Sequence, residues 1–142
     1  MSDVLIVDAS VAVKWCVEEE EADIAEIVLR SAKEIRAPRL LFGEVANAIW
    51  KKVWRGDLLP RTGMEAISLL PGCIHTVVDK DELLFTALEI AVTYNHPVYD
   101  CVYIACAREF DLPLVTADAR LLRKFRSSPY GPSILLLSDW RA

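Results

Sequence analysis

The sequence predicts an α/β protein built on a parallel sheet. Residues 4–7 form an uninterrupted apolar run rich in β-branched side chains, which is the pattern of a strand buried on both faces. Short apolar runs recur along the chain, and segments with helical periodicity separate them. Strands that alternate with helices favour a parallel sheet with right-handed crossovers. In such sheets, ligands bind at the carboxyl ends of the strands.

The length and composition favour a single domain spanning residues 1–142. With 54% hydrophobic and 26% charged residues, the chain is globular rather than disordered. No apolar run could cross a bilayer and no signal-like N-terminus is present, so we expect a cytoplasmic protein with no membrane partner. The four cysteines form no CxxC pair, which favours reduced thiols. A net charge of −5 argues against a protein that coats nucleic acid, but it allows an enzyme with a local basic patch.

In the first half of the chain, Ser10 is the predicted cap of a short helix that runs through Val17. The acidic run at 18–21 suits the solvated start of the next helix, where acids favour the helix dipole. Amphipathic spacing then predicts a helix over residues 22–35. The elements that follow are a very short strand at 37–38, a helix over 40–53 between Pro38 and Gly56, and a helix over 60–70 stopped by Pro71.

In the second half, Asp79 and Glu82 resemble a capping box at the start of a helix that stops at Asn95-His96-Pro97. Residues 100–110 are apolar nearly all round, which predicts a buried helix. The other predicted elements are strands at 74–78, 114–115 and 134–137 and a short basic helix at 118–125.

Four acids lie where an isolated charge is costly. Asp8 and Asp118 each follow a strand, Glu44 falls on the apolar arc of its helix, and Asp100 heads the buried helix. The three aspartates can also be helix caps, and Glu44 can reach solvent. As a set they are harder to explain by stability, because two carboxylates about 5 Å apart repel by about 3 kcal/mol. Protons or a cation must neutralise such a cluster, and oxygen ligands favour Mg²⁺ or Mn²⁺.

Around these acids the sequence resembles the PIN-domain nucleases, and among them the VapC-type toxins of toxin–antitoxin pairs. Four blocks carry the resemblance: Val7-Asp8-Ala9-Ser10 with Val13-Lys14-Trp15, Pro38 with Glu44-Val45-Ala46-Asn47-Ala48, Tyr99-Asp100-Cys101-Val102-Tyr103-Ile104-Ala105, and Val115-Thr116-Ala117-Asp118-Ala119-Arg120-Leu121. The family's four acids map onto Asp8, Glu44, Asp100 and Asp118. The resemblance implies a three-layer α/β/α fold with a central five-stranded parallel sheet over residues 1–142.

The resemblance also implies a function. The expected activity is divalent-metal-dependent endoribonuclease cleavage, in which activated water attacks the phosphodiester in line and leaves 5′-phosphate and 3′-hydroxyl ends. The expected partners are an RNA substrate, a second copy of the chain in a homodimer, and a VapB-like antitoxin. The main candidate metal ligands are Asp8, Asp100 and Asp118, while Glu44 ligates directly, acts through water or orients the nucleophile. The candidates for holding carboxylates or waters in place are Ser10, Asn47 and Thr116.

RNA must approach an acidic protein through its basic side chains. The candidate phosphate-binding residues are Lys14, Arg120, Arg123 and Lys124, with Arg126 and the group Lys51, Lys52 and Arg55 as further possibilities. The cluster at 120–126 is favoured because it follows Asp118 closely, although any single cation can equally be a solvated helix residue.

Two further sets of side chains invite a functional reading. The default interpretation of the tryptophans at 15, 50 and 54 is that they pack in the core. A more specific hypothesis is that Trp50 and Trp54 line a groove that binds an antitoxin helix. His75 and His96 are expected to be structural, because one lies in a strand run and the other at a helix end.

Two other functions compete with a nuclease. Phosphoryl-transfer domains also place an acid after a strand, but a dehalogenase-type site needs an acid where Ser10 stands. A receiver domain needs a lysine after its last strand, where Ser138-Asp139-Trp140 stands, and the chain has no GxxxxGK loop. The alternative that remains is a non-catalytic PIN-like module that binds RNA or protein. Loss of one acid would mark such a module, and all four are present.

Overall fold

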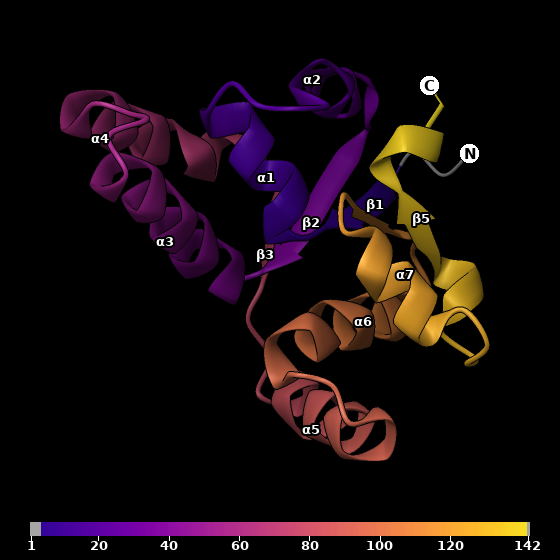
Figure 1. Ribbon diagram of the computed structural model, residues 1–142. Coiled ribbons are helices and arrows are strands. Elements are labelled where there is room, and N and C mark those ends of the chain that lie inside the picture. The colour runs from indigo at the N-terminus through magenta and orange to yellow at the C-terminus, as the bar shows by residue number, and fades with distance from the viewer. Residues whose placement is uncertain (1–3, 142) are drawn as a thin grey trace.

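Five parallel strands form one sheet at the centre of the computed structural model, which describes residues 4–141 (Figure 1). The strands are β1 (Val4–Val7), β2 (Glu34–Pro38), β3 (Thr76–Val78), β4 (Leu114–Thr116) and β5 (Ile134–Leu136). Their order in the sheet is β3-β2-β1-β4-β5, which puts β1 in the middle. Val7 of β1 is in register with Val115 of β4. The next residues of the two segments, Asp8 and Thr116, therefore meet at the carboxyl edge of the sheet.

Helices cover both faces of this sheet. They are α1 (Ala9–Cys16), α2 (Ala22–Ser31), α3 (Leu40–Trp54), α4 (Pro60–Leu69), α5 (Glu82–Tyr94), α6 (Val98–Phe110) and α7 (Ala119–Phe125), with short 3₁₀ turns at Leu70–Cys73, Gly131–Ser133 and Leu137–Asp139. Helix α6 packs on β1, β2 and β4, and α5 lies outside it, while α1 lies on the other side with α2 and α3 packed against it (Figure 1). This arrangement confirms the predicted three-layer α/β/α fold with its five-stranded parallel sheet.

The core lies where the apolar runs predicted it. Leu5, Ile6 and Val7 of β1 are at most 1% exposed, as expected for a central strand covered on both faces. Residues 101–107 of α6 are all buried, which confirms the buried helix. Within residues 4–141, no helix combines the length and the apolar character that a membrane span requires.

The predicted helix over residues 22–35 is too long. Helix α2 ends at Ser31, and the backbone of Ala32 is already extended. Ile35 belongs instead to β2, where burial alternates over residues 34–37 and Ile35 pairs with Leu5 of β1. A single buried isoleucine fits the helical and the strand period equally well over so short a stretch, and pairing with the central strand decides between them.

Three predicted helix starts also differ from the structure. Asp8 rather than Ser10 caps α1. The capping box before α5 is not formed, because Asp79 pairs with Arg39 at 3.0 Å and the residue before the helix, Asp81, makes no side-chain cap. Helix α6 begins at Val98, two residues before the predicted start. Asp100 therefore lies inside the first turn, and its carboxylate is not needed as a cap.

Candidate functional site

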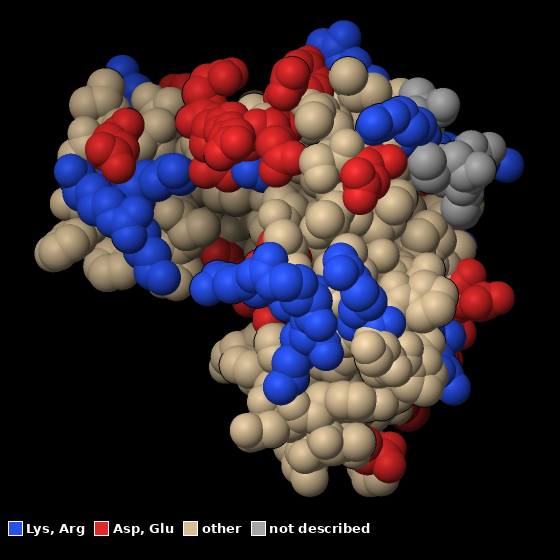
Figure 2. Space-filling view, turned by 45° about the vertical axis from the view of Figure 1, so that its right-hand side comes forward, with Lys and Arg blue, Asp and Glu red and all other residues tan. Residues whose placement is uncertain are grey.

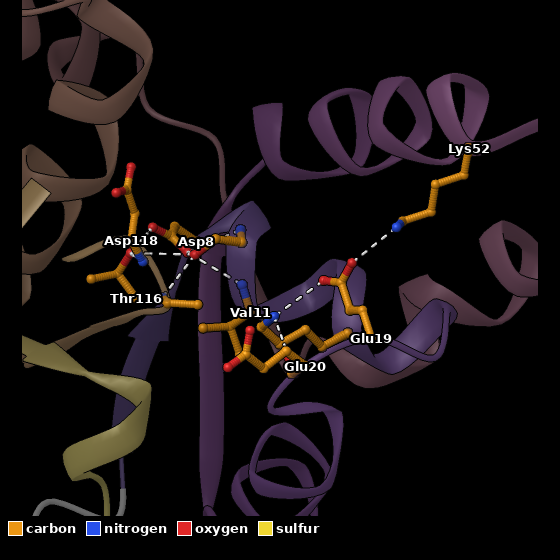
Figure 3. A network of polar contacts seen from close by, with 10 residues as sticks. Asp8, Val11, Glu19, Glu20, Lys52, Thr116 and Asp118 are labelled. Atoms are coloured by element: carbon orange, nitrogen blue, oxygen red, sulfur yellow. Dashed lines mark hydrogen bonds and ion pairs between the residues drawn. The ribbon is translucent and has the colours of Figure 1, made fainter. Parts of the chain in front are cut away.

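Asp8 is held at the carboxyl end of β1 by four hydrogen bonds. Its Oδ1 accepts the backbone N–H groups of Ser10 and Val11 and the hydroxyl of Ser10, and its Oδ2 accepts the hydroxyl of Thr116 (Figure 3). The residue is only 6% exposed. Burial raises the pKa of Asp8 to about 6, although the hydroxyl bonds oppose the shift and the nearby charge of Asp100 adds to it. A cation close to Asp8 would stabilise the ionised form of this buried carboxyl.

The hydroxyls of Ser10 and Thr116 connect β1 to β4 across the sheet edge. Ser10 Oγ accepts the backbone N–H of Ala117 at 2.9 Å, and Thr116 Oγ1 accepts the N–H of Asp118 at 3.1 Å. Asp118 in turn caps α7 by accepting the N–H of Arg120 at 2.9 Å. Both hydroxyls thus lie against Asp8 and fix its position relative to the segment that carries Asp118 (Figure 3).

Glu44 of α3 reaches the same region through a contact that the sequence did not predict. The buried hydroxyl of Tyr103 on α6 donates to Glu44 Oε1 at 2.6 Å. Partial burial raises the pKa of Glu44, the hydrogen bond from Tyr103 opposes this shift, and the charge of Asp100 adds to it. Burial also raises the pKa of Tyr103 far above its usual value, so its hydroxyl remains a donor.

Asp100 projects from the first turn of α6, and its Oδ2 lies 2.8 Å from Nε2 of His96. The charge of Asp100 raises the pKa of both Asp8 and Glu44. The structure therefore brings Asp100 within electrostatic reach of both Asp8 and Glu44. Asp118 joins them through Thr116, which hydrogen bonds to both Asp8 and Asp118.

The chemistry of these side chains fits a hard divalent cation. Within residues 4–141, one oxygen of Glu44, one of Asp100 and one of Asp118 accept no hydrogen bond, while the other oxygen of each is fixed by a donor. Oxygen-only donors of this kind are the ligands that Mg²⁺ and Mn²⁺ prefer. As they stand, no three His, Cys, Asp or Glu side chains in this part of the chain are arranged to hold one ion. Binding by three of them therefore requires side-chain movement.

Three of the four predicted phosphate-binding residues share one exposed surface. Arg120, Arg123 and Lys124 are exposed on α7, and with the adjacent Arg126 they form what we call the α7 basic cluster. Figure 2 shows basic side chains gathered over α7 beside a hollow that has acidic side chains on its floor. Nε of Arg120 lies 3.5 Å from Asp118 Oδ1, which links this cluster directly to the acids.

Lys14, the fourth predicted phosphate-binding residue, lies in a different environment. Its Nζ is bound by Glu19 at 3.2 Å and by the carbonyl of Glu20 at 2.6 Å, and its side chain is 10% exposed. Glu19 also pairs with Lys52 of α3 at 3.1 Å (Figure 3). The acidic run before α2 thus ties α1 to α3, rather than only being solvated as the start of a helix.

Of the tryptophans at 15, 50 and 54, one packs between helices and two are exposed. Trp15 donates its indole N–H to the carbonyl of Ala25 at 2.8 Å and joins α1 to α2. Trp50 and Trp54 are 57% and 76% exposed, and their rings lie 6.5 Å apart. Next to them, a groove of about 240 Å³ runs between α3 and α4. It is lined by Ala46, Ile49, Trp50, Val53, Pro60, Gly63, Met64 and Ile67.

Three other predicted roles can be compared with the structure. His75 accepts the backbone N–H of Ile35 at 3.0 Å, which is the structural role expected of it. His96 instead contacts Asp100. Asn47 is exposed on α3, and its side chain makes no hydrogen bond to residues 4–141. A sequence signal for Tyr103 did exist, because a buried tyrosine needs a partner for its hydroxyl. No helical spacing links His96 to Asp100, because His96 lies before the first residue of α6.

Comparison with known proteins adds to this geometry. The family model for the PIN domain matches residues 5–126. Ribonuclease VapC3 of Pyrobaculum aerophilum is 32% identical over 123 residues, which cover 85% of this chain and 94% of that protein. The crystal structure of PAE2754 from the same organism has a TM-score of 0.74 at 22% identity, over 97% of this chain and 93% of that one. A chain of a toxin–antitoxin complex from Klebsiella pneumoniae has a TM-score of 0.63 at 13% identity, over 94% and 97% of the two chains. Both structural likenesses concern the fold.

Proposed function

Because this chain belongs to the PIN-domain family, we infer that it is a ribonuclease of the VapC type. The observation that carries this inference is the convergence of acids from separate segments at one sheet edge. Burial raises the pKa of both Asp8 and Glu44, the charge of Asp100 raises both further, and Thr116 joins the Asp8 carboxylate to the backbone of Asp118. The β4–β5 pairing extends the sheet beyond the matched residues, which supports treating residues 1–142 as one PIN domain.

We propose that the enzyme depends on Mg²⁺ or Mn²⁺. Asp8, Asp100 and Asp118 would hold the ion, and Glu44 would hold it directly or through water. The bound ion would polarise the scissile phosphate and lower the pKa of water for in-line attack. Ser10 and Thr116 keep the Asp8 carboxylate oriented, and Tyr103 does the same for Glu44. The products would carry 5′-phosphate and 3′-hydroxyl ends, as the family resemblance implies.

RNA would reach the acids along the α7 basic cluster. The exposed guanidinium and ammonium groups of this cluster follow directly on Asp118, and contacts of this kind position a nucleic-acid backbone without reading its sequence. Lys51 and Arg55, which are exposed at the end of α3, offer a second set of phosphate contacts. The pairing of Lys14 with Glu19 favours a smaller role for that side chain.

We propose two protein partners, and each is supported by a separate apolar surface. The groove beside Trp50 and Trp54 suits the apolar face of an antitoxin helix. Helix α5 exposes Leu84, Phe85, Leu88 and Val92, all more than half exposed. Contiguous patches of this kind are rare on monomers, so we assign this face to a second copy of the chain. The four free cysteines support a cytoplasmic location.

Cleavage of labelled RNA by the purified protein tests the function. We expect cleavage with Mn²⁺, none with a chelator, and none by Asp8→Asn, whereas the exposed control Asp23→Asn should cleave like the parent. Cleavage by Asp8→Asn at the parental rate would remove Asp8 from the reaction. If the parent binds RNA but cuts none, the non-catalytic binding module becomes the better description. Sequencing RNA ends after induction in cells would identify the substrate and the end chemistry together.

A further inference from the structure

We propose that His96 is a positioning residue that fixes one oxygen of Asp100 and leaves the other oxygen for the metal. The inference rests on the proposed metal-dependent nuclease function. Its starting point is the distance of 2.8 Å between His96 Nε2 and Asp100 Oδ2. Among residues 4–141, no other side chain hydrogen bonds to Asp100.

The imidazole of His96 is held in place from two sides. Asn95, the residue before it, ends α5 in the left-handed conformation with φ 51°, and the backbone N–H of His96 donates to the carbonyl of Ala91 at 3.1 Å. The ring packs edge-on against buried Phe125 of α7, with centroids 5.3 Å apart and an interplanar angle of 77°. The side chain is 17% exposed. A histidine fixed in this way presents its nitrogen at a defined point beside α6.

The direction of the hydrogen bond follows from the chemistry of the acceptor. An ionised carboxylate can only accept, so Nε2 carries the hydrogen. The terminal torsion of an aspartate has a broad distribution, and an anchor on Oδ2 narrows the positions that Oδ1 can take. Carboxylates that ligate metals are commonly held by such outer partners, and loss of the partner costs about 10–100-fold in metal affinity. Ser10 and Thr116 orient the Asp8 carboxylate through hydrogen bonds from their hydroxyls. His96 would orient the Asp100 carboxylate in the same way, through a hydrogen bond from its ring.

The decisive variants are His96→Gln and His96→Asn. The amide nitrogen of glutamine can reach the place of Nε2, whereas that of asparagine is one methylene too short. Mn²⁺ binding measured by calorimetry should weaken about 10-fold in His96→Asn and less than about 3-fold in His96→Gln. His75→Asn is the matched control, because among residues 4–141 the His75 ring bonds only to the backbone of Ile35, and this variant should bind Mn²⁺ like the parent. Melting curves in chelator verify that each variant is folded.

Asp100→Asn separates failure of this inference from failure of the proposed function. If Asp100→Asn loses Mn²⁺ binding but His96→Asn retains it, His96 does not position the ligand. Equal losses in His96→Asn and His96→Gln would also overturn the role of the Nε2 donor. If Asp100→Asn binds Mn²⁺ as tightly as the parent, the metal site itself is wrong. In the unmodified protein, ¹⁵N NMR should find the hydrogen of the neutral ring on Nε2, and a hydrogen on Nδ1 would contradict the proposal even if a variant failed to fold.

Discussion

The Asp8 carboxylate caps α1, and it is also one of the four acids of the candidate site, where its ionised form would be a buried charge. Burial holds its pKa at about 6, against an ordinary value of 3.8. The folded protein therefore binds the Asp8 proton more tightly than the unfolded chain does. The stabilisation linked to this group is complete below about pH 4 and is lost as the pH rises through about 6.

Asp8→Asn should stabilise the metal-free protein while abolishing cleavage. Asparagine is as good a helix cap as aspartate, so the main change is loss of the buried charge. We expect the free energy of unfolding in chelator to rise by about 2–3 kcal/mol at pH 7–8, since each pKa unit corresponds to about 1.4 kcal/mol. Denaturant titrations across the pH range would measure the gain, which should disappear below about pH 4. A gain that is independent of pH would contradict the assignment to Asp8 ionisation.

Tyr103→Phe should raise the pKa of Glu44 further. The hydroxyl of Tyr103 donates to Glu44 and opposes the effect of burial on that carboxyl. Phenylalanine keeps the ring and removes only the donor. Carbon-13 NMR of the Glu44 carboxyl would follow its titration, and the acidic limb of the cleavage rate should move to higher pH with it. Tyr99→Phe is the control on the same helix, because Tyr99 is 63% exposed. An unchanged titration of Glu44 in Tyr103→Phe would show that the contact is unimportant.

For individual residues, the sequence identifies the acids of the site better than the side chains that hydrogen bond to those acids. The positions of Asp8 and Asp118 follow from the strands that precede them, because parallel strands end at the same edge. Tyr103 lies 59 residues from Glu44 along the chain, and only the arrangement of α3 and α6 in the folded protein brings the two side chains together. The contact between His96 and Asp100 likewise depends on how the chain turns between α5 and α6.

Helix α7 combines a capping acid with exposed cations. Replacing Arg120, Arg123 and Lys124 by alanine in an Asp8→Asn background should weaken RNA binding without altering the fold, because all three side chains are exposed. The slope of log affinity against log salt should fall by about 2, since each lost phosphate contact removes about 0.7 on single strands. A control with alanine at Arg30, Lys33 and Lys80 removes the same charge from other surfaces. Equal weakening by both triple variants would mean that net charge matters rather than α7.

Secondary structure is predicted well where an element is long or central. The doubly buried β1 follows from its uninterrupted apolar run, and the buried α6 from a segment that is apolar nearly all round. Local signals failed where a tertiary contact prevailed. Ile35 belongs to β2 because it can pair with β1. Asp79 does not cap α5 because it pairs with Arg39 instead. Neither partner is visible in a short window of sequence.

Across the whole molecule, two exposed apolar surfaces should have distinct partners. Phe85→Asp with Leu88→Asp should convert a homodimer into a monomer, because charges on this face of α5 cannot be buried against a second copy. Sedimentation equilibrium would measure the mass. Trp54→Asp should leave the dimer intact. A monomeric parent at high concentration would rule out α5 as a dimer surface.

Trp54→Ala should weaken binding of a VapB-type antitoxin that binds the parent, whereas Phe85→Ala should not. Trp54 lies beside the groove, with its ring 6.5 Å from that of Trp50, which lines it. Large aromatic side chains are frequent anchors at interfaces, and truncation of an anchor typically costs more than about 1 kcal/mol of binding free energy. Calorimetric titration of folded variants would measure the difference. Unchanged affinity in Trp54→Ala would place the antitoxin elsewhere.

The pairing of β1 with β4 has a consequence for how the protein is made. Asp8 is synthesised early, but the hydroxyl that completes its environment belongs to Thr116, 108 residues further along the chain. During translation, a nascent chain can contain Asp8, Glu44 and Asp100 and still lack β4, Thr116 and Asp118. Such a nascent chain lacks one of the four proposed metal ligands, so we expect that it cleaves no RNA until β4 has docked beside β1 and Asp118 has joined the other three acids.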